Sequence, residues 1–153
     1  MNATGQQIIS PTESNDGQEE NFKQVFGKQK VYALELRNSS AEERIVKLKK
    51  LRDAVLAHRE DIYRACYNDF RKSETEVDLS EIFPVSLEAN HAIKQLKKWM
   101  KPVPVMPTKA TFGTRSYIRY EPMGVNLIIS PWNYPVNLTL CPLISAIAAG
   151  NTA

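Results

Sequence analysis

Apolar residues recur with helical spacing over most of the first hundred positions. Helical spacing first connects Phe22, Val25, Phe26, Gln29 and Ala33. Gly27 weakens that helix, because glycine disfavours a helix interior. Ser40 and Glu43 then form a capping-box pattern. It is followed by an apolar stripe at Ile45, Leu48, Leu51, Val55 and Ile62. This pattern predicts a long helix that begins after Ser40 and breaks near His58.

A second capping-box pattern lies further along the chain. Ser73 with Glu76 predicts a helix that runs to Phe83. Pro84 then either interrupts this helix or, as we prefer, starts a further helix, where its missing donor costs nothing. The apolar side of that further helix would hold Val85, Ala89, Ala92, Ile93, Leu96 and Met100.

The pattern changes on both sides of this predicted helical region, residues 22–101. Residues 1–21 are mostly polar, with little to bury, and we expect them to form a mobile tail. Prolines crowd residues 100–107, which predicts an extended connector. Residues 117–120 alternate in polarity and indicate a strand. We therefore assign 102–121 to a connector and a strand.

Charged residues disappear after Glu121, although they make up 24% of the chain. Residues 125–129 are mainly β-branched and aliphatic, which predicts a strand buried on both faces of a parallel sheet. Residues 131–135 hold two prolines and predict a stiff loop. Residues 136–149 are apolar and predict a helix that ends at Gly150. The order strand, loop, helix indicates an α/β fold.

Pro142 leaves the start of this last helix open. A helix that begins near Val136 would be kinked at Pro142, whereas a helix capped by Thr139 would hold Pro142 in its first turn. The uncharged run is long enough to span a bilayer, at roughly 20 residues. Two prolines and two asparagines near its middle disfavour a membrane span.

Composition narrows the function classes only slightly. The chain has 153 residues, 42% of them hydrophobic, and a net charge of +3. Its basic residues alternate with acidic ones, so we expect no nucleic-acid partner. His58 and His91 have no neighbouring ligands, and we assign neither to a metal. Cys66 lies on an apolar stripe and is expected to be buried. With Cys141 as the only other cysteine, we expect a reducing, cytoplasmic setting.

Three spaced blocks resemble the NAD(P)-dependent aldehyde dehydrogenases, and among them the class that includes fatty aldehyde dehydrogenases. The blocks are Glu-Pro-Met-Gly-Val at 121–125, Ile-Ser-Pro-Trp-Asn-Tyr-Pro at 129–135 and Pro-Leu-Ile-Ser-Ala-Ile-Ala-Ala-Gly-Asn at 142–151. Looser similarity extends back to about Phe22. The resemblance implies that residues 122–153 begin a Rossmann-like NAD(P)-binding domain. In that family a cysteine thiolate attacks the aldehyde, hydride passes to the nicotinamide, and a glutamate activates the water that hydrolyses the thioester.

The resemblance also implies roles for individual residues. Asn133 matches the asparagine whose side-chain amide stabilises the oxyanion of the tetrahedral intermediate. A neutral amide suits this role because it donates hydrogen bonds to developing negative charge without protonation control. Tyr134 and Leu138 match positions near the substrate tunnel. The segment that would lie against the nicotinamide ribose of NAD or NADP comprises Ile129, Ser130, Pro131 and Trp132.

The remaining catalytic groups are expected beyond Ala153. These are the reactive cysteine, the general-base glutamate and a Lys-Pro-Ser/Thr-Glu segment for the adenosine ribose. Neither Cys66 nor Cys141 has a neighbour that would activate its thiol. The resemblance thus implies the N-terminal portion of an aldehyde dehydrogenase, inactive alone and homodimeric when full length. We expect the isolated chain to associate through residues 125–149. The alternative is a noncatalytic helical interaction or oligomerisation module from a truncated gene.

Overall fold

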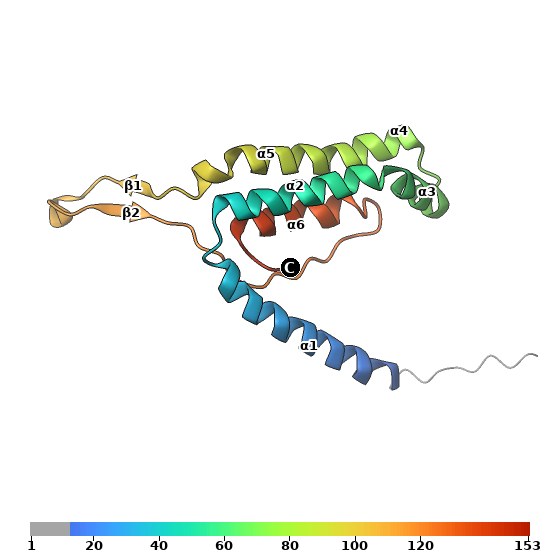
Figure 1. The fold of residues 1–153 in the computed structure, drawn as a ribbon, viewed down its shortest axis with the longest axis horizontal. Helices are drawn as coiled ribbons and strands as arrows, with labels where there is room; N and C mark the ends of the chain where they lie inside the picture. Colours follow the sequence, from blue (N-terminus) through green and yellow to red (C-terminus); the bar gives the residue numbers. More distant parts are fainter. Residues whose placement is uncertain (1–12) are drawn as a thin grey trace, which may run out of the picture.

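Three helices form the body of the protein in a computed structural model that describes residues 13–153. They are α2 (Ala41–Ala57), α5 (Phe83–Trp99) and α6 (Asn137–Ala149), which pack against one another in all pairs (Figure 1). Helices α3 (Arg59–Phe70) and α4 (Glu74–Val77) close one end of the body. The core is built from Leu48, Val55, Val77, Val85, Ala89, Ala92, Leu96 and Ile144. Small alanines on α5 let the helices approach closely, which makes burial of this apolar surface efficient.

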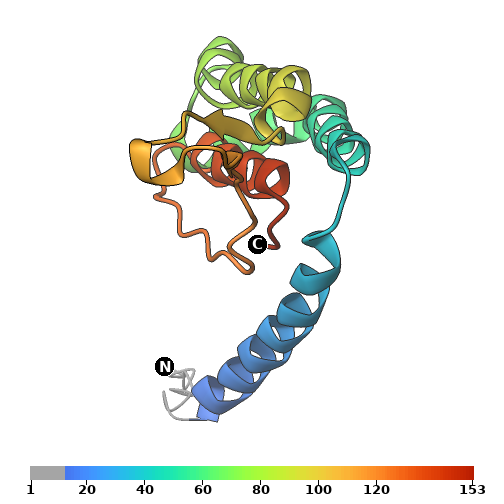
Figure 2. The same cartoon turned by 90° about the vertical axis from the view of Figure 1, so that its left-hand side faces the viewer.

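Two elements project from this body. Helix α1 (Glu13–Leu36) leads away from it on one side, as Figures 1 and 2 both show. On another side, β1 (Val103–Val105) and β2 (Ser116–Ile118) form an antiparallel ribbon, with Val103 opposite Ile118. A 3₁₀ turn, η2 (Lys109–Thr111), lies in the connection between the two strands. The structure thus contains the expected extended connector and strand, and it pairs them as a hairpin.

The helix starts follow the predicted side-chain caps. The N–H of Ser40 donates to Glu43 Oε2 at 2.7 Å, and the N–H of Glu43 donates to Ser40 Oγ at 3.2 Å. These reciprocal bonds satisfy donors that the first turn of α2 would leave free. His58 ends α2 and precedes α3, so the predicted break is confirmed. Ser73 accepts from the N–H of Glu76 at 3.3 Å and starts α4.

The boundary between the next two predicted helices is a widened turn. Residues Asp78–Ile82 form a π-helical segment, η1, and the chain stays helical from Glu74 through Trp99. Pro84 lies in the first turn of α5, as preferred from the sequence. Its missing donor is tolerated there. A π turn thus connects α4 to α5 where a break was expected.

The predicted tail is too long. Helix α1 begins at Glu13, so residues 13–21 are helical, while residues 1–12 of the predicted tail lie outside the described residues. Glu19 and Lys23, one helical turn apart, form an ion pair at 2.8 Å. Such pairs support an exposed helix. The apolar residues predicted to form one face of this helix are exposed as well, among them Phe22 at 71% and Phe26 at 53%.

The predicted strand at residues 125–129 is wrong for this chain. Only a single parallel bridge, Val125 with Thr152, is present in the segment. The N–H of Asn126 donates to the carbonyl of Thr152 at 2.8 Å, and beyond it no strand pairs with the segment. Leu127 and Ile129 are 82% and 85% exposed. A strand is stable only with a hydrogen-bonding neighbour along its length, and the described residues supply one at only one end.

Helix α6 resolves the alternatives at Pro142. It begins at Asn137, and Pro142 lies inside it on an exposed face. The N–H of Leu140 donates to the carbonyl of Val136 at 2.9 Å, so a full turn precedes the proline. Gly150 ends the helix with φ 87°, as predicted. None of the described helices has the length and apolar character needed to cross a membrane.

Candidate functional site

The loop from Ser130 to Val136 carries most of the residues singled out in the sequence. It has no regular secondary structure and leads into α6. Two charged side chains from elsewhere in the chain contact its backbone. Lys72 comes from the link between α3 and α4, and Glu81 comes from η1.

Glu81 lies against the N-terminus of α6. Its side chain is fully buried, and Oε2 accepts from the N–H of Val136 at 3.2 Å and of Asn137 at 2.9 Å. The first N–H groups of a helix have no partner within the helix, and the helix dipole favours negative charge at this end. Glu81 therefore caps α6 from a position 56 residues away along the chain.

Lys72 neutralises this carboxylate and contacts the middle of the loop. Its Nζ lies 2.8 Å from Glu81 Oε1 and donates to the carbonyl of Asn133 at 2.7 Å. It also lies 4.3 Å from the ring centroid of Tyr134, a cation–π distance. The Lys72 side chain is 10% exposed, so the pair is almost dry. A buried ion pair of this kind is tolerated because hydrogen bonds satisfy both partners.

Side chains of α6, the helix that follows the loop, also bind the loop. Thr139 Oγ1 donates to the carbonyl of Pro135 at 2.6 Å and lies 2.6 Å from Ser130 Oγ. Because the single hydroxyl hydrogen of Thr139 goes to that carbonyl, Ser130 is the donor in the second bond. Asn137 Nδ2 donates to the carbonyl of Ser80 at 2.9 Å. The backbone of the loop is therefore fixed at several points.

The sequence-predicted site residues lie together on and beside this fixed loop. The Asn133 side chain is exposed, although the carbonyl of the same residue is bound by Lys72. Ile129 and Trp132 are 85% and 86% exposed. Tyr134 and Leu138 are partly exposed, at 37% and 38%. The arrangement presents one amide and several apolar surfaces to solvent, and the individual roles of these residues stay predictions.

Neither cysteine has the surroundings of an activated nucleophile. Cys66 is 3% exposed and lies in the core, where burial chiefly, and the Glu81 carboxylate secondarily, raises the pKa of its thiol. Burial likewise raises the pKa of Cys141, with a smaller contribution from Glu88. A raised pKa reduces the fraction of reactive thiolate. The prediction that Cys66 is a small buried residue is confirmed.

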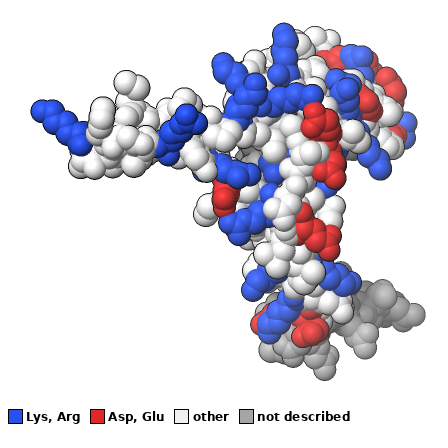
Figure 3. Space-filling model, turned by 60° about the vertical axis from the view of Figure 1, so that its left-hand side comes forward, with Lys and Arg blue, Asp and Glu red and all other residues white. Residues whose placement is uncertain are grey.

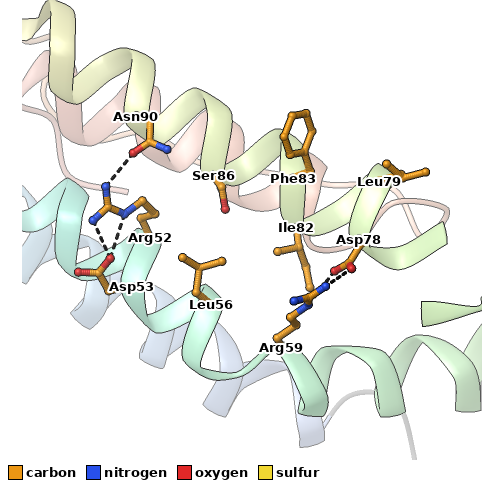
Figure 4. A pocket seen from close by; sticks show the side chains of 10 residues that line it. All are labelled: Arg52, Asp53, Leu56, Arg59, Asp78, Leu79, Ile82, Phe83, Ser86 and Asn90. Carbon is orange, nitrogen blue, oxygen red and sulfur yellow. Dashed lines mark hydrogen bonds and ion pairs between the residues drawn. The ribbon is translucent and has the colours of Figure 1, made fainter. Parts of the chain in front are cut away.

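A separate cavity of about 570 Å³ lies between α2 and the η1–α5 stretch (Figure 4). Arg59 donates to Asp78 at one end, and Arg52 donates to Asp53 and Asn90 at the other. The Arg59 guanidinium, with the Tyr63 hydroxyl, holds the pKa of Asp78 below its usual value. Both arginines are neutralised, and no predicted site residue lines this cavity. Within residues 13–153 no cluster of His, Cys, Asp and Glu could hold a metal ion.

A third buried charge lies at the other end of α6. Arg44 is 5% exposed, and its Nη1 donates to the carbonyl of Ala148 at 3.1 Å. Its Nε donates to Ser39 Oγ at 2.8 Å. Burial lowers the pKa of Arg44. A Cβ at Gly150 would meet the guanidinium, so Arg44 would have to shift, and the positive φ of this residue also favours glycine.

None of the three buried charges, Lys72, Glu81 and Arg44, was predicted from the sequence, although two of them carried a signal. Glu81 lies four residues from both Val77 and Val85 on an apolar stripe. Arg44 precedes Leu48 by the same spacing. A charge at a core position of a helix indicates a buried partner, because an unpaired charge is not stable there. Lys72, in a short link between helices, carried no such signal.

Comparison with known proteins places these features in context. The sequence profile of the aldehyde dehydrogenase family matches residues 2–153. Aldehyde dehydrogenase family 3 member B1 of Mus musculus is 43% identical over 115 residues, or 75% of this chain and 25% of that protein. The 4,4'-diaponeurosporen-aldehyde dehydrogenase of Staphylococcus aureus is 45% identical over 106 residues, or 69% of this chain and 23% of that protein. A solved structure, the substrate-bound state of Staphylococcus aureus AldH, matches with a TM-score of 0.83 at 39% identity.

That structural match covers 86% of this chain and 29% of the solved one. The chain spans about a quarter of the length of the two relatives named above. The similarity confirms the predicted fold class, because this helix-rich chain with its small two-stranded sheet is consistent with an incomplete α/β domain. Since the family profile extends over nearly every residue, the chain belongs to the aldehyde dehydrogenase family.

Proposed function

We propose that this chain forms the N-terminal part of an enzyme that oxidises an aldehyde to a carboxylic acid with NAD or NADP. The aldehyde would be held as a thiohemiacetal on a cysteine outside this chain. One observation carries the proposal: the Asn133 amide is exposed on a loop whose backbone is bound by Lys72 and Glu81. Membership of the aldehyde dehydrogenase family supports it.

Asn133 is the oxyanion donor in this proposal. Its amide carries two N–H donors and no charge, so it can stabilise the negative oxygen of a tetrahedral intermediate at any working pH. Such a donor is most effective when it is already in place before the charge develops. The fixed carbonyl of the same residue supports that arrangement, because the backbone around Asn133 has little freedom to reorganise.

The residues before Asn133 fit the nicotinamide end of the cofactor. Ile129 and Trp132 are exposed apolar side chains on either side of Pro131, and they offer a surface that a planar ring and its ribose could cover. When bound, NAD(P) supplies the hydride acceptor. The partly exposed Tyr134 and Leu138 would line the aldehyde site on the helix side of the loop. The chain alone would be inactive, because neither of its cysteines is activated.

The test is aldehyde-dependent NADH or NADPH production by the full-length protein. Asn133→Ala should lower kcat by about 10²–10³-fold, the usual effect of removing one oxyanion donor. Asn68→Ala is the matched control, because Asn68 is an exposed asparagine on α3. A wild-type protein without turnover would overturn the proposed activity, and an Asn133→Ala variant at full rate would overturn the role of that residue.

A second candidate, an oligomerisation module, is favoured by the hairpin. Met106 and Phe112 are both 88% exposed, and Tyr117 is 62% exposed. Figure 3 shows the projecting hairpin as largely uncharged between basic residues. A two-stranded ribbon with open edges and apolar side chains is suited to pairing with another chain. We propose that the full-length protein is a homo-oligomer and that the isolated chain associates. Sedimentation velocity tests this, since a monodisperse monomer would contradict it.

A further inference from the structure

We propose that Glu81 and Lys72 are positioning residues that set where the Asn133 amide stands. They bind the main chain at Asn133 and at the start of α6, and they leave the Asn133 side chain free. This inference rests on the proposed role of Asn133 as the oxyanion donor. It adds two residues that carry no reactive atom and act only through the loop.

The contacts of the pair are directed at the loop backbone. Lys72 binds the carbonyl of Asn133, and Glu81 binds the N–H groups of Val136 and Asn137. These three backbone groups lie at the two ends of a five-residue segment, residues 133–137. Lys72 and Glu81 bind each other at 2.8 Å, so the two ends of the segment are held at a fixed separation.

Burial makes this hold stiff. The Glu81 side chain is fully buried, and that of Lys72 is 10% exposed, so water has little access to replace these bonds. The ammonium also lies over the Tyr134 ring, which limits the lysine to one side of the loop. A displacement of about 1 Å at a reacting group can lower a rate by roughly 10²-fold. Small changes in the positions of Lys72 and Glu81 should therefore lower the rate of the reaction.

A purely structural ion pair would behave differently. Replacing both members of a buried pair by apolar residues of similar volume often leaves stability unchanged or improved. The double variant Lys72→Met/Glu81→Leu would fill the same space without a bond to the loop. If the pair serves stability alone, this variant should be active. If the pair positions Asn133, the variant should fold and still lose turnover.

The first arm uses the 153-residue chain and measures amide hydrogen exchange by NMR. In the double variant the amides of Val136 and Asn137 should exchange at least about 10-fold faster, because they lose their acceptor. The amide of Thr152, which donates to the carbonyl of Gly124, should be unchanged. Unchanged exchange at residues 136 and 137 would overturn the proposal. Glu60→Gln and Lys94→Met are matched controls at exposed positions.

The second arm measures steady-state kinetics of the full-length protein. The double variant should lower kcat by about 10- to 100-fold, with the KM for NAD(P) within about 2-fold of wild type. Glu81→Asp keeps the charge and should recover part of both kcat and amide protection. An active wild type with a fully active double variant would overturn the positioning role alone. An inactive wild type would overturn the proposed function, and the exchange arm would still decide whether the pair holds the loop.

Discussion

The two ends of α6 are held by buried charges of opposite sign. At its N-terminus the Glu81 carboxylate accepts from backbone N–H groups, and at its C-terminus the Arg44 guanidinium donates to a backbone carbonyl. Each charge matches the helix dipole at its end. Each also comes from a distant part of the chain, 56 and 104 residues away. The two ends of α6 are therefore stabilised by these distant side chains as well as by residues of its own sequence.

The two ends differ in how the charge is balanced. Glu81 has a counter-ion, Lys72, whereas no described carboxylate pairs with Arg44, which is bound by neutral oxygens of Ala148 and Ser39. Removing Glu81 would leave a second charge buried and unpaired, but removing Arg44 would leave only neutral groups. The N-terminal end, which carries the proposed site, should therefore be the more sensitive of the two.

Loss of the N-terminal carboxylate should have the largest effect. Glu81→Leu leaves the Lys72 ammonium without its counter-ion and should lower the free energy of unfolding by about 3–5 kcal/mol. Urea unfolding of the 153-residue chain measures this. Adding Lys72→Met should restore much of the loss. A single variant that loses less than about 1 kcal/mol would contradict the assigned burial of the pair.

Loss of the C-terminal guanidinium should cost less. Arg44→Met keeps most of the apolar stem but removes the bonds to Ala148 and Ser39, for an expected loss of about 2–3 kcal/mol. The same urea measurement applies. Arg64→Met is the control, because the Arg64 side chain is 72% exposed. An effect equal to that of Glu81→Leu would remove the asymmetry between the ends.

The effects of Gly150→Ala and Arg44→Met on the free energy of unfolding should not be additive. Gly150→Ala forces a Cβ into a positive-φ residue and against Arg44, with an expected loss of about 1–3 kcal/mol. In the Arg44→Met background the collision is absent, so only the backbone strain should remain. A double-mutant cycle by urea unfolding should therefore give a coupling between the two sites. Strict additivity would show that the guanidinium moves aside freely.

Asp78 should have the smallest effect, and only at low pH. It opens the same π turn that carries Glu81, and Arg59, then Tyr63, lower its pKa. A lowered folded-state pKa stabilises the protein above the unfolded value of about 3.8, and this stabilisation is lost as pH falls through the folded value. Asp78→Asn should therefore be less stable than wild type at pH 7. The difference should shrink as pH falls below about 3.8, in acid unfolding followed by circular dichroism.

Local features of the fold followed from the sequence. The capping box at Ser40, the side-chain cap at Ser73, the break at His58 and the stop at Gly150 depend on residues within one or two turns, so spacing alone predicted them. The exposed loop with Asn133 followed from its prolines and from the family resemblance. The strand at 125–129 did not form, because strand pairing depends on neighbours that local sequence does not specify.

The groups that hold the site could not be found in the same way. Lys72 looks like an ordinary surface charge in a short link between helices. The burial of Lys72 and Glu81 depends on contacts with residues 133–137, more than fifty positions later in the chain. Helical spacing puts Glu81 on the apolar stripe, but it does not predict which backbone N–H groups bind the carboxylate. Long-range packing decides that, and a single sequence does not report it.

The π turn keeps the buried face of the helical stretch in phase. Val77, Glu81, Val85 and Ala89 follow one another at intervals of four, and each is buried. In an unbroken α-helix three such intervals would rotate the face by roughly 120°. The wider turn at Asp78–Ile82 absorbs part of that rotation. Deleting one residue from this turn would thus shift the phase of every residue before it and swing Glu81 or its flanking core residues toward solvent.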